Sequence, residues 1–383
     1  MNPGALLKAL ALVAAWPLLA WMLSHYHPAL LTSFGASMET ALLGLALSGI
    51  LVAIGFSQWR IGCAFLLLLC GYAILRQDHY PDALLMPVLF GLALLPWLPE
   101  RGLLGPGPMV SAALLLVSSM VWLRGGEPAA IAEAAMLRTV PIPGVEIAWA
   151  ALPAVLSLAL LLPWLLWRRD GLLVGFAGAL LTALSLVPPL SLTQPLSAAI
   201  AAALALWTGL LLHAWRIAYL DQLTGLPNRR ALEEQLKRLP GRWSLAMLDV
   251  DHFKKFNDTW GHDIGDQVLR RVAGTLAGVG GRGRAFRYGG EEFSVIFPHD
   301  DMARAQQAIE DIRARIEETP FEVRGERKGS KSRGKGKGRA SQTITISAGL
   351  TCAQKESAQT TFKRADKALY RAKAQGRNRV VKV

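Results

Sequence analysis

The chain has 383 residues, which is enough for two or three domains of ordinary size. Its hydrophobic fraction is 52% and its formal net charge is +13, and this hydrophobic share is high for a wholly soluble protein. Three cysteines are too few for a disulfide framework, so we expect small buried thiols and no need for an oxidising compartment.

Charge divides the chain at about residue 220. Residues 1–220 hold nine Lys/Arg and eight Asp/Glu, whereas residues 221–383 hold 32 Lys/Arg and 20 Asp/Glu. A nearly uncharged half followed by a basic half predicts a membrane domain over residues 1–220 and a soluble domain over residues 221–383.

The first half contains about eight apolar stretches of the length that crosses a bilayer. They cover residues 5–23, 40–56, 61–75, 84–98, 109–123, 145–167, 172–190 and 198–220. The third and fourth are short enough to tilt or to merge. Tryptophans such as Trp21 and Trp167 fall near the expected ends, where amphipathic rings prefer to lie. We therefore expect a multi-span α-helical membrane domain.

Loop cations set the expected orientation of this domain. With eight spans, one side holds Lys8, Arg60, Arg101, Arg168, Arg169 and Arg216. The other side holds only Arg76, Arg124 and Arg138. The richer side should be cytoplasmic, which predicts a multi-pass protein of the cell (inner) membrane with both termini and the soluble domain in the cytoplasm.

The apolar half favours a sensor or an anchor over a transporter. None of the expected spans carries Asp, Glu, Lys or Arg at mid-depth, although proton relays and ion pathways usually need such groups. The first stretch is long and lacks a small-residue cleavage site, so we expect a retained anchor and not a signal peptide. The sequence does not identify the input signal.

In the soluble half, a short apolar strand is predicted over residues 244–251, and it ends in Asp249 and Asp251. Alternate residues of a strand point to the same face, so both carboxylates could face one site. Carboxylates at a strand end commonly bind Mg²⁺, a hard ion that prefers oxygen ligands. Taken alone the pattern is weak, because acidic residues often simply end strands.

The stretch after this strand places Asn257 and Asp266 around a glycine-bearing loop. An Asp can accept hydrogen bonds from the ring N–H and the exocyclic amine of guanine, and an Asn amide can pair with the remaining edge. A site with such groups strongly rejects a base that lacks their partners. The two residues together could therefore read guanine.

Gly289, Gly290, Glu291 and Glu292 stand between two predicted strands and predict a tight hairpin. The two glycines allow a positive φ and leave room for a substrate near the backbone. Adjacent glutamates repel each other unless solvent or a cation compensates. Beside Asp249 they would complete a site for two divalent ions, an arrangement suited to in-line attack on a phosphoryl group.

Residues 365–378 predict an amphipathic helix that stops at Gly376. Lys373 and Arg377 are expected one turn apart and could clamp triphosphate oxygens. As an isolated feature, cations in a last turn are ordinary partners of the helix dipole.

Together these segments closely resemble the GGDEF domain of diguanylate cyclases, with the signature loop in its Gly-Gly-Glu-Glu-Phe variant. The resemblance runs over residues 221–378. It implies an α/β (α+β) domain with a central, mainly antiparallel sheet flanked by helices, like the palm of class III adenylyl cyclases. It also implies that two GTP molecules are joined into cyclic di-GMP by two domains that face each other, and hence a homodimer.

Carried over residue by residue, the resemblance implies that Asp249, the Val250 carbonyl and Glu292 hold magnesium, with two Mg²⁺ per site and Mn²⁺ as a possible substitute. Glu291 would join these ligands or help to deprotonate the attacking 3′-hydroxyl, and the two roles stay open. The implied substrate-binding residues are Asn257 and Asp266 for guanine, Phe253, Lys254, Lys373 and Arg377 for the phosphates, and Gly289 and Gly290 beside the substrate. Asp266 favours GTP on both sides, because family members that make mixed cyclic GMP-AMP typically have Ser there.

The sequence departs from the family in two places. Many cyclases carry Arg-x-x-Asp before the hairpin as a product-binding site, but residues 280–283 here are Gly-Gly-Arg-Gly, so we expect weak or absent inhibition through that site. Residues 324–339 hold eight cations and one acid and interrupt the hairpin expected between strands near residues 321–323 and 343–350.

This basic run predicts a disordered insertion over residues 324–341. It is either a solvated loop or a segment that adheres to anionic lipid headgroups. Nucleic-acid binding is not expected, because the run has no aromatic residues for base stacking.

Two functions of different classes stay open. The first is a magnesium-dependent, membrane-bound diguanylate cyclase, and the second is a non-catalytic GGDEF module that binds GTP or a partner. The presence of every metal and guanine position favours the enzyme.

Overall fold

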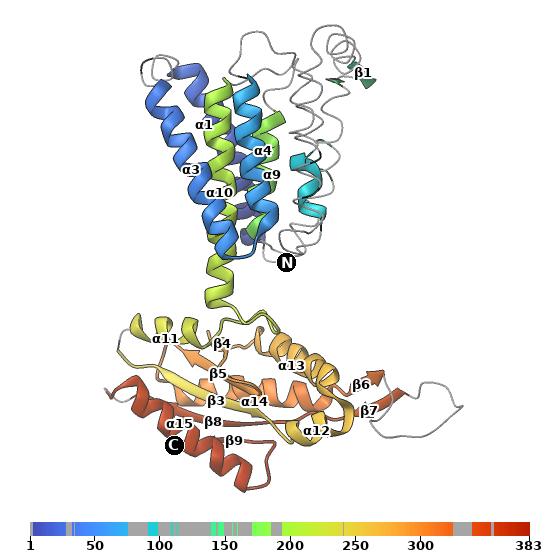
Figure 1. Cartoon of the computed structure of the whole chain (residues 1–383). Helices are drawn as coiled ribbons and strands as arrows, with labels where there is room; N and C mark the ends of the chain where they lie inside the picture. Colours follow the sequence, from blue (N-terminus) through green and yellow to red (C-terminus); the bar gives the residue numbers. More distant parts are fainter. Residues whose placement is uncertain are drawn as a thin grey trace, which may run out of the picture. The chain divides into compact units, whose positions relative to one another are not determined.

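The computed structural model of the chain describes residues 3–27, 33, 35–75, 91–98, 109, 113, 139–142, 145–148, 155, 159, 171–184, 194–239, 241–324, 339–353 and 356–383 (Figure 1). The chain divides into two compact units, Met1–Trp215 and Arg216–Val383, and the division falls within helix α10. We call the first the apolar unit and the second, after the function that its sequence predicts, the catalytic unit.

The apolar unit is helical because its segments are almost uninterrupted runs of Leu, Ala and other apolar residues. Its helices are α1 (Pro3–Tyr26), α3 (Gly35–Gly55), α4 (Trp59–Leu75), α9 (Gly171–Leu184) and α10 (Pro195–Tyr219), with a short 3-10 helix, η2 (Leu95–Trp97). Glycine sets the closest helix packing: a Cβ at Gly175 of α9 would lie 2.9 Å from the Ala205 carbonyl oxygen of α10. The helices therefore pack backbone to backbone at this point.

Two of these helices, Ala36–Gly55 and Pro195–Tyr219, are long and apolar enough to cross a membrane. Shorter apolar helices cover Ala11–Tyr26, Trp59–Ala73 and Leu172–Leu184. Five of the eight expected stretches thus coincide with helices. Residues 84–90 of the expected span 84–98, most of the spans 109–123 and 145–167, and the end of 172–190 lie outside the described residues.

One expected span is wrong at its start. Strand β2 (Val145–Ala148) pairs antiparallel with β1 (Thr139–Ile142), so residues 145–148 are not the first turn of a helix. The sequence explains this, because both strands are rich in β-branched residues and a Pro-Gly dipeptide at residues 143–144 separates them.

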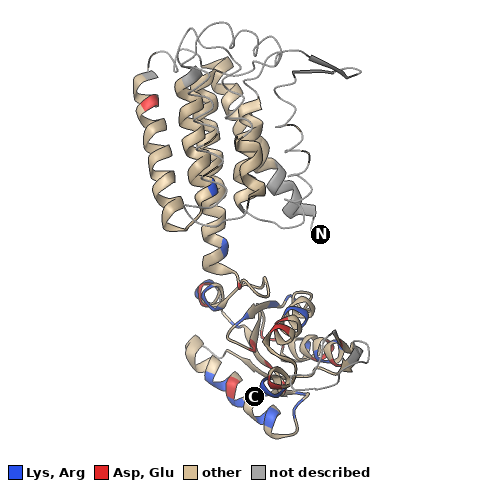
Figure 2. Cartoon of the chain, turned by 45° about the vertical axis from the view of Figure 1, so that its right-hand side comes forward, with Lys and Arg blue, Asp and Glu red and all other residues tan. Residues whose placement is uncertain are grey.

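Charge distinguishes the two units. Figure 2 shows Lys, Arg, Asp and Glu gathered over the catalytic unit and sparse on the helices of the apolar unit. The charges of the apolar unit have local partners: Tyr72 donates a hydrogen bond to Glu39, and Arg60 donates to the carbonyls of Pro96 and Leu98. Large apolar side chains of α3 face outward, and Leu43, Leu47 and Leu51 are more than half exposed.

The catalytic unit is built on a five-stranded sheet in the order β4-β5-β3-β8-β9. The strands are β3 (Ser244–Val250), β4 (Arg284–Arg287), β5 (Glu292–Phe297), β8 (Ile346–Cys352) and β9 (Val380–Lys382). All neighbouring pairs are antiparallel except β8 and β9, which are parallel. This confirms the expected α/β domain with a mainly antiparallel central sheet.

Helices cover both faces of this sheet. Helices α12 (Phe253–Trp260), α13 (His262–Leu276) and α14 (Met302–Glu318) pack against the even-numbered residues of β3, such as Leu248. Helices α11 (Arg229–Lys237) and α15 (Ala358–Ala374) pack on the other face, against Leu245 and Met247. Because side chains alternate along a strand, Asp249 belongs to the face that α11 and α15 cover.

The basic run is flanked by the strand expected near residues 321–323 and by a second strand that was not expected. Strand β6 (Phe321–Arg324) pairs with β7 (Arg339–Gln342) in a separate two-stranded sheet, whereas β8 lies in the central sheet. The prediction of disorder over residues 324–341 is therefore wrong at both ends, and the partner of the 321–323 strand was placed too late in the sequence. Residues 325–338 lie outside the described part of the chain.

Candidate active site

Three of the predicted site residues meet at the end of β3. Asp249 of β3 lies directly opposite Glu292 of β5, and both side chains point to the face that carries α15. Lys373 of α15 reaches the same site from the helix that covers this face, with its Nζ 2.9 Å from Asp249 Oδ2. Since Asp249 is only 4% exposed, this ion pair lies at the bottom of the site.

Gly349 of β8 makes the approach of α15 possible. A Cβ at this position would overlap the backbone of α15 at Ala365, Ala368 and Leu369. Any side chain at residue 349 would therefore push the helix off the sheet, and Lys373 would move away from Asp249 with it.

Negative charge is in excess at this point. Burial raises the pKa of Asp249, although the hydrogen bond and the charge of Lys373 oppose the shift. Burial, followed by the charge of Asp249, raises the pKa of Glu291, and the neighbouring Glu292 adds to the rise. Carboxyl groups held in this way bind protons or cations more readily than free ones.

The donor set suits magnesium. Among the described residues, no three His, Cys, Asp or Glu side chains are close enough together to hold a metal ion without movement. Asp249, Glu291 and Glu292 are nevertheless hard oxygen donors whose mutual repulsion a cation would relieve. The Val250 amide donates to the Glu291 carbonyl over 3.3 Å, which holds the hairpin turn against the strand end. The metal role of these residues and of the Val250 carbonyl stays a prediction.

The two glycines of the hairpin do not serve to allow a positive φ, as had been expected. Neither Gly289 nor Gly290 has a positive φ, so that expectation is wrong. A Cβ at Gly289 would lie 2.8 Å from Glu292 Oε2, whereas a Cβ at Gly290 would meet open space. Gly289 thus makes room for the Glu292 carboxylate, and Gly290 leaves the surface of the turn bare.

Arg287 is a site residue that the sequence reasoning missed. It donates to the carbonyls of Gly289 (3.1 Å) and Gly290 (2.7 Å), and to Asp221 Oδ1 (2.7 Å). Burial alone would raise the pKa of Asp221, but hydrogen bonds from Thr224 and Arg287 outweigh it and lower this pKa. One guanidinium therefore fixes the catalytic hairpin to the start of the catalytic unit. The available signal was an Arg, with its five donors, directly before a glycine turn.

The two predicted guanine-reading residues come from α12 and α13. Asn257 of α12 directs its Oδ1 at Gly265 of α13, where an added Cβ would overlap it, and Asp266 follows directly. This amide oxygen is buried and has no hydrogen-bond partner in the part of the chain that the structure describes. Buried acceptors are normally satisfied, so the oxygen is available to a donor on a ligand.

The four predicted phosphate residues are arranged in two pairs. Lys254 is exposed in the first turn of α12, but the Phe253 side chain is only 6% exposed and packs in the core, so Phe253 can offer only its backbone N–H. Helix α15 ends at Ala374, and Arg377 follows with a left-handed φ of 64°. Lys373 and Arg377 are thus not on one helix, which corrects the expectation. The positive charge of Arg377 nevertheless opposes the rise in the pKa of Asp249, so Arg377 lies close enough to act on the same site as Lys373.

Asp251 has a different role from the one its spacing indicated. Its carboxylate accepts hydrogen bonds from the hydroxyls of Thr345 (2.8 Å) and Ser347 (2.7 Å) and from the Asn378 amide (3.1 Å). It therefore anchors the segment after α15 to β3 and β8, and the idea that it shares a metal site with Asp249 is wrong.

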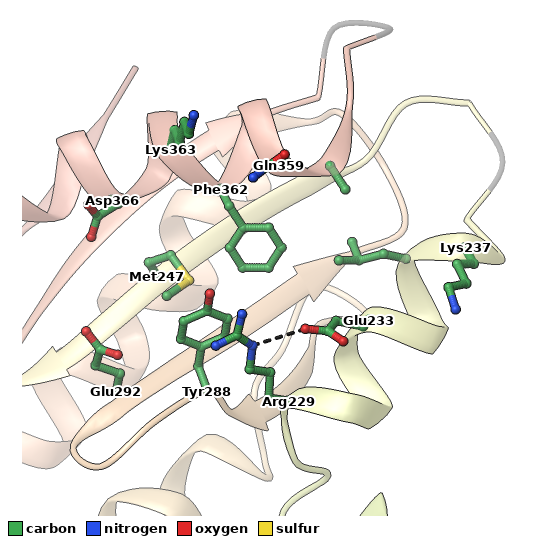
Figure 3. Close-up of a pocket in the computed structure, with 12 residues that line it drawn as sticks. Arg229, Glu233, Lys237, Met247, Tyr288, Glu292, Gln359, Phe362, Lys363 and Asp366 are labelled. Atoms are coloured by element: carbon green, nitrogen blue, oxygen red, sulfur yellow. Dashed lines mark hydrogen bonds and ion pairs between the residues drawn. The ribbon is translucent and has the colours of Figure 1, made fainter.

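A cavity of about 670 Å³ opens on the same face, between α11 and α15 (Figure 3). Glu292 is one of its lining residues, so the cavity reaches the carboxylates that the sequence predicts to be catalytic. Tyr288 and Phe362 stack within it at 5.5 Å, and the Arg229 guanidinium lies 4.8 Å from the Tyr288 ring. No sequence pattern had indicated this cavity.

Comparisons with known proteins agree with this geometry. Residues 218–379 match the family described as diguanylate cyclase, GGDEF domain. The response regulator PleD of Caulobacter vibrioides is 41% identical over 177 residues, which cover 44% of this chain and 37% of PleD. The diguanylate cyclase VdcA of Vibrio cholerae is 40% identical over 169 residues, covering 43% of this chain and 47% of VdcA. The chain thus spans less than half the length of these curated relatives.

Solved structures of GGDEF domains are also similar in sequence. One is the structure of the coiled coil and GGDEF domain of DgcB from Caulobacter crescentus in complex with c-di-GMP, which is 36% identical to this chain. The match covers 90% of that structure and 45% of this chain, with a TM-score of 0.39. The active GGEEF domain of a diguanylate cyclase from Vibrio cholerae is 31% identical, with 89% of it and 40% of this chain covered and a TM-score of 0.32. The chain therefore contains a GGDEF domain over residues 218–379. Diguanylate cyclases are among the relatives that this domain resembles.

Proposed function

We propose that the protein is a diguanylate cyclase that condenses two GTP molecules into cyclic di-GMP and releases two pyrophosphates. The observation that carries the proposal is the meeting of Asp249, Glu292 and Lys373 at the end of β3, within a GGDEF domain. Relatives named as diguanylate cyclases, such as DgcP of Pseudomonas aeruginosa with 41% identity over 177 residues, support it.

Asp249, the Val250 carbonyl, Glu292 and, in part, Glu291 are the residues that would hold Mg²⁺. When bound, two such ions neutralise charge on the phosphates and on the attacking oxygen. The chain's own cations add to this neutralisation. Lys373 lies on Asp249 and can turn to a phosphate oxygen, and Lys254 and Arg377 bind phosphate from the rims of the site. Asn257 and Asp266 orient the guanine.

Glu291 is best suited to accept the proton of the attacking 3′-hydroxyl. Its pKa is raised by burial and by Asp249, and a base whose pKa lies closer to neutrality takes up a proton more readily. Each 3′-oxygen then bonds to the α-phosphorus of the other GTP, and the bond from that phosphorus to pyrophosphate breaks. Two P–O bonds form and two break in each product.

A homodimer follows from this chemistry. One catalytic unit holds a single set of catalytic carboxylates, whereas the product contains two GMP units. Two copies must therefore face each other, with one GTP in each.

The apolar unit would anchor the protein as a multi-pass protein of the cell (inner) membrane, with the catalytic unit in the cytoplasm. Two long apolar helices, three shorter ones and the outward-facing leucines of α3 support this proposal. The loop cations support the orientation. Proteolysis of the catalytic unit in inside-out vesicles, and its protection in right-side-out vesicles, would test it.

Adhesion of the basic run to anionic headgroups is proposed on charge alone, since about 1 kcal/mol per surface cation is available near an anionic membrane. The full chain would be reconstituted into neutral vesicles and into vesicles with an anionic lipid. Replacing the eight cations of residues 324–339 by Ser should remove any difference in activity between the two. Equal activity of the unaltered chain in both would overturn the proposal.

Inhibition by the product through the usual product-binding site should be weak or absent. Gly283 stands where that motif has its Asp, and a Cβ there would lie 2.8 Å from Phe297 Cε1. The position thus has no room for the missing carboxylate. Tight binding of cyclic di-GMP that Arg282→Ala weakens would contradict this.

Product analysis of the full-length protein with GTP and Mg²⁺ tests the proposed function. Cyclic di-GMP should form and should be lost in Glu291→Ala and Glu292→Ala. Well-folded, dimeric protein that binds GTP but forms no product would favour the alternative, a non-catalytic module that binds GTP or a partner.

A further inference from the structure

Tyr370 of α15 is unusually exposed for an aromatic residue. Its exposed fraction is 73%, and the other large apolar side chains with high exposure among the described residues of the catalytic unit are Ile217, at 41%, and the terminal Val383, at 36%. Isolated apolar residues on a surface are common, so exposure alone decides nothing. The surroundings of Tyr370 decide its role.

Tyr370 lies between the cavity and the catalytic ion pair. At 3.6 residues per turn, Phe362, Asp366, Tyr370 and Lys373 fall within about 100° of one another around α15. Phe362 and Asp366 line the cavity, and Lys373 pairs with Asp249. Figure 3 shows Phe362 pointing from α15 toward Tyr288, with Asp366 further along the helix on the side of Glu292. This strip of α15 therefore borders the catalytic face along its length.

The same strip carries two opposite charges. Lys363 and Asp366 are exposed and one turn apart, and within the residues that the structure describes neither has an ion-pair partner. A two-fold interface must be self-complementary, because each residue meets its counterpart's neighbour and the reverse. A Lys and an Asp at such spacing satisfy this requirement: Lys363 of one copy can meet Asp366 of the other, twice.

We propose that the strip of α15 formed by Lys363, Asp366 and Tyr370 is the surface on which the catalytic unit of a second copy docks during the reaction. This inference rests on the proposed function, which requires two catalytic faces to meet. The strip lies on the required face, beside Glu292 and Lys373, and it combines an exposed aromatic anchor with self-complementary charges. Tyr370 acts by positioning the second copy.

Charge reversal in the full-length protein tests the contact between copies. Lys363→Glu leaves two acids on the strip and Asp366→Lys leaves two cations, so each variant alone should lose about 5- to 20-fold in turnover through like-charge repulsion. The two variants are then co-expressed with different tags and the mixed oligomer is isolated by tandem purification. Its contacts are again between opposite charges, so it should regain at least about half of the original activity. A role within one copy cannot be restored in this way.

Controls separate this surface from the site itself. Binding of a non-hydrolysable GTP analogue should stay within about twofold in every variant, and Arg304→Glu on α14, on the other face of the sheet, should leave turnover unchanged. Tyr370→Ala should lower turnover and Tyr370→Phe should retain it. A mixed oligomer no more active than the average of the two single variants, or single variants as active as the original chain, would overturn the inference. Absence of cyclic di-GMP from the unaltered chain would instead overturn the proposed function.

Discussion

Asp249 and Asp251 lie two residues apart at the end of β3, and their surroundings are opposite. Asp251 accepts hydrogen bonds from Thr345, Ser347 and Asn378, so its oxygens are well supplied with donors. Asp249 has Lys373 beside it but also burial and neighbouring carboxylates, and its pKa is raised. The Asp251 carboxylate stabilises the fold. The Asp249 carboxylate lies in surroundings that do not fully balance its negative charge.

The contrast between Asp251 and Asp249 distinguishes a structural carboxylate from a functional one at the end of one strand. A satisfied buried charge resists change because its loss leaves donors without partners. A buried charge in an environment that does not balance it costs stability and persists because a ligand completes it. The unpartnered amide oxygen of Asn257 belongs with Asp249 in the second group.

The largest expected effect is that of Asp249→Asn on catalysis. The substitution keeps the shape and removes the charge that the cations of the reaction need, so turnover should fall by at least about 100-fold. Stability should change little, because the lost Lys373 pair is compensated by relief of burial and repulsion. Product formation and thermal denaturation of the same sample measure both. A variant that loses activity only because it unfolds would show that Asp249 is an anchor too.

Asp251→Ala should give the reverse result. Removing the acceptor leaves two hydroxyls and the Asn378 amide without their partner, at a cost of about 2–4 kcal/mol in the free energy of unfolding. Turnover per folded molecule should fall much less than in Asp249→Asn. Denaturant unfolding, with activity normalised to folded protein, makes the comparison. Equal stability of the two variants would break the distinction.

Gly265→Ala should weaken GTP binding without unfolding the protein. The new Cβ would displace the Asn257 amide, the flexible end of a side chain, so GTP affinity should drop by about 10- to 100-fold. Gly274→Ala on the same helix is the matched control, since a Cβ there meets nothing within 4 Å. It should stabilise α13 by about 0.5–1 kcal/mol and leave GTP binding unchanged. Equal GTP affinity in the two variants would show that Asn257 does not read guanine.

The sequence was sufficient for the parts of the site that depend on local pattern. The glycine turn and the family resemblance together placed Glu292 beside Asp249, and the resemblance assigned roles to Lys373, Asn257 and Asp266. It was not sufficient for Asp251, because its three donors come from residues 94 to 127 positions later in the chain. No local pattern encodes such pairings.

Backbone conformation was the other source of error. The helix stop at Gly376 was predicted correctly, but Arg377 adopts a left-handed φ that non-glycine residues rarely take, so its expected place one helical turn after Lys373 was wrong. The hairpin glycines, in contrast, were expected to have positive φ but are required for space at Gly289. In both cases the deciding contact is local: the Arg377 N–H donates to the Ala372 carbonyl, and Gly289 faces the Glu292 carboxylate.

The smallest expected effect is that of Glu291→Gln on stability. Its sign tests whether Glu291 resembles Asp249, whose charge is not balanced, or Asp251, whose charge is. A raised pKa in the folded chain means that ionising Glu291 costs more there than in the unfolded chain. The wild type therefore loses stability as the pH rises from the ordinary value of 4.5 through the raised pKa, and the loss persists at neutral pH.

Gln cannot ionise, so at pH 7 with EDTA the variant should melt higher than the wild type, and near pH 4 the two should coincide. Glu291 is partly exposed to solvent, which screens its charge and limits the difference to about 1–2 °C. Adding Mg²⁺ should stabilise the wild type more than the variant. The ion neutralises the ionised Glu291 carboxylate of the wild type, and Gln offers no such charge. If the wild type melts higher at pH 7 without Mg²⁺, Glu291 is already satisfied within the fold and belongs with Asp251, not with Asp249.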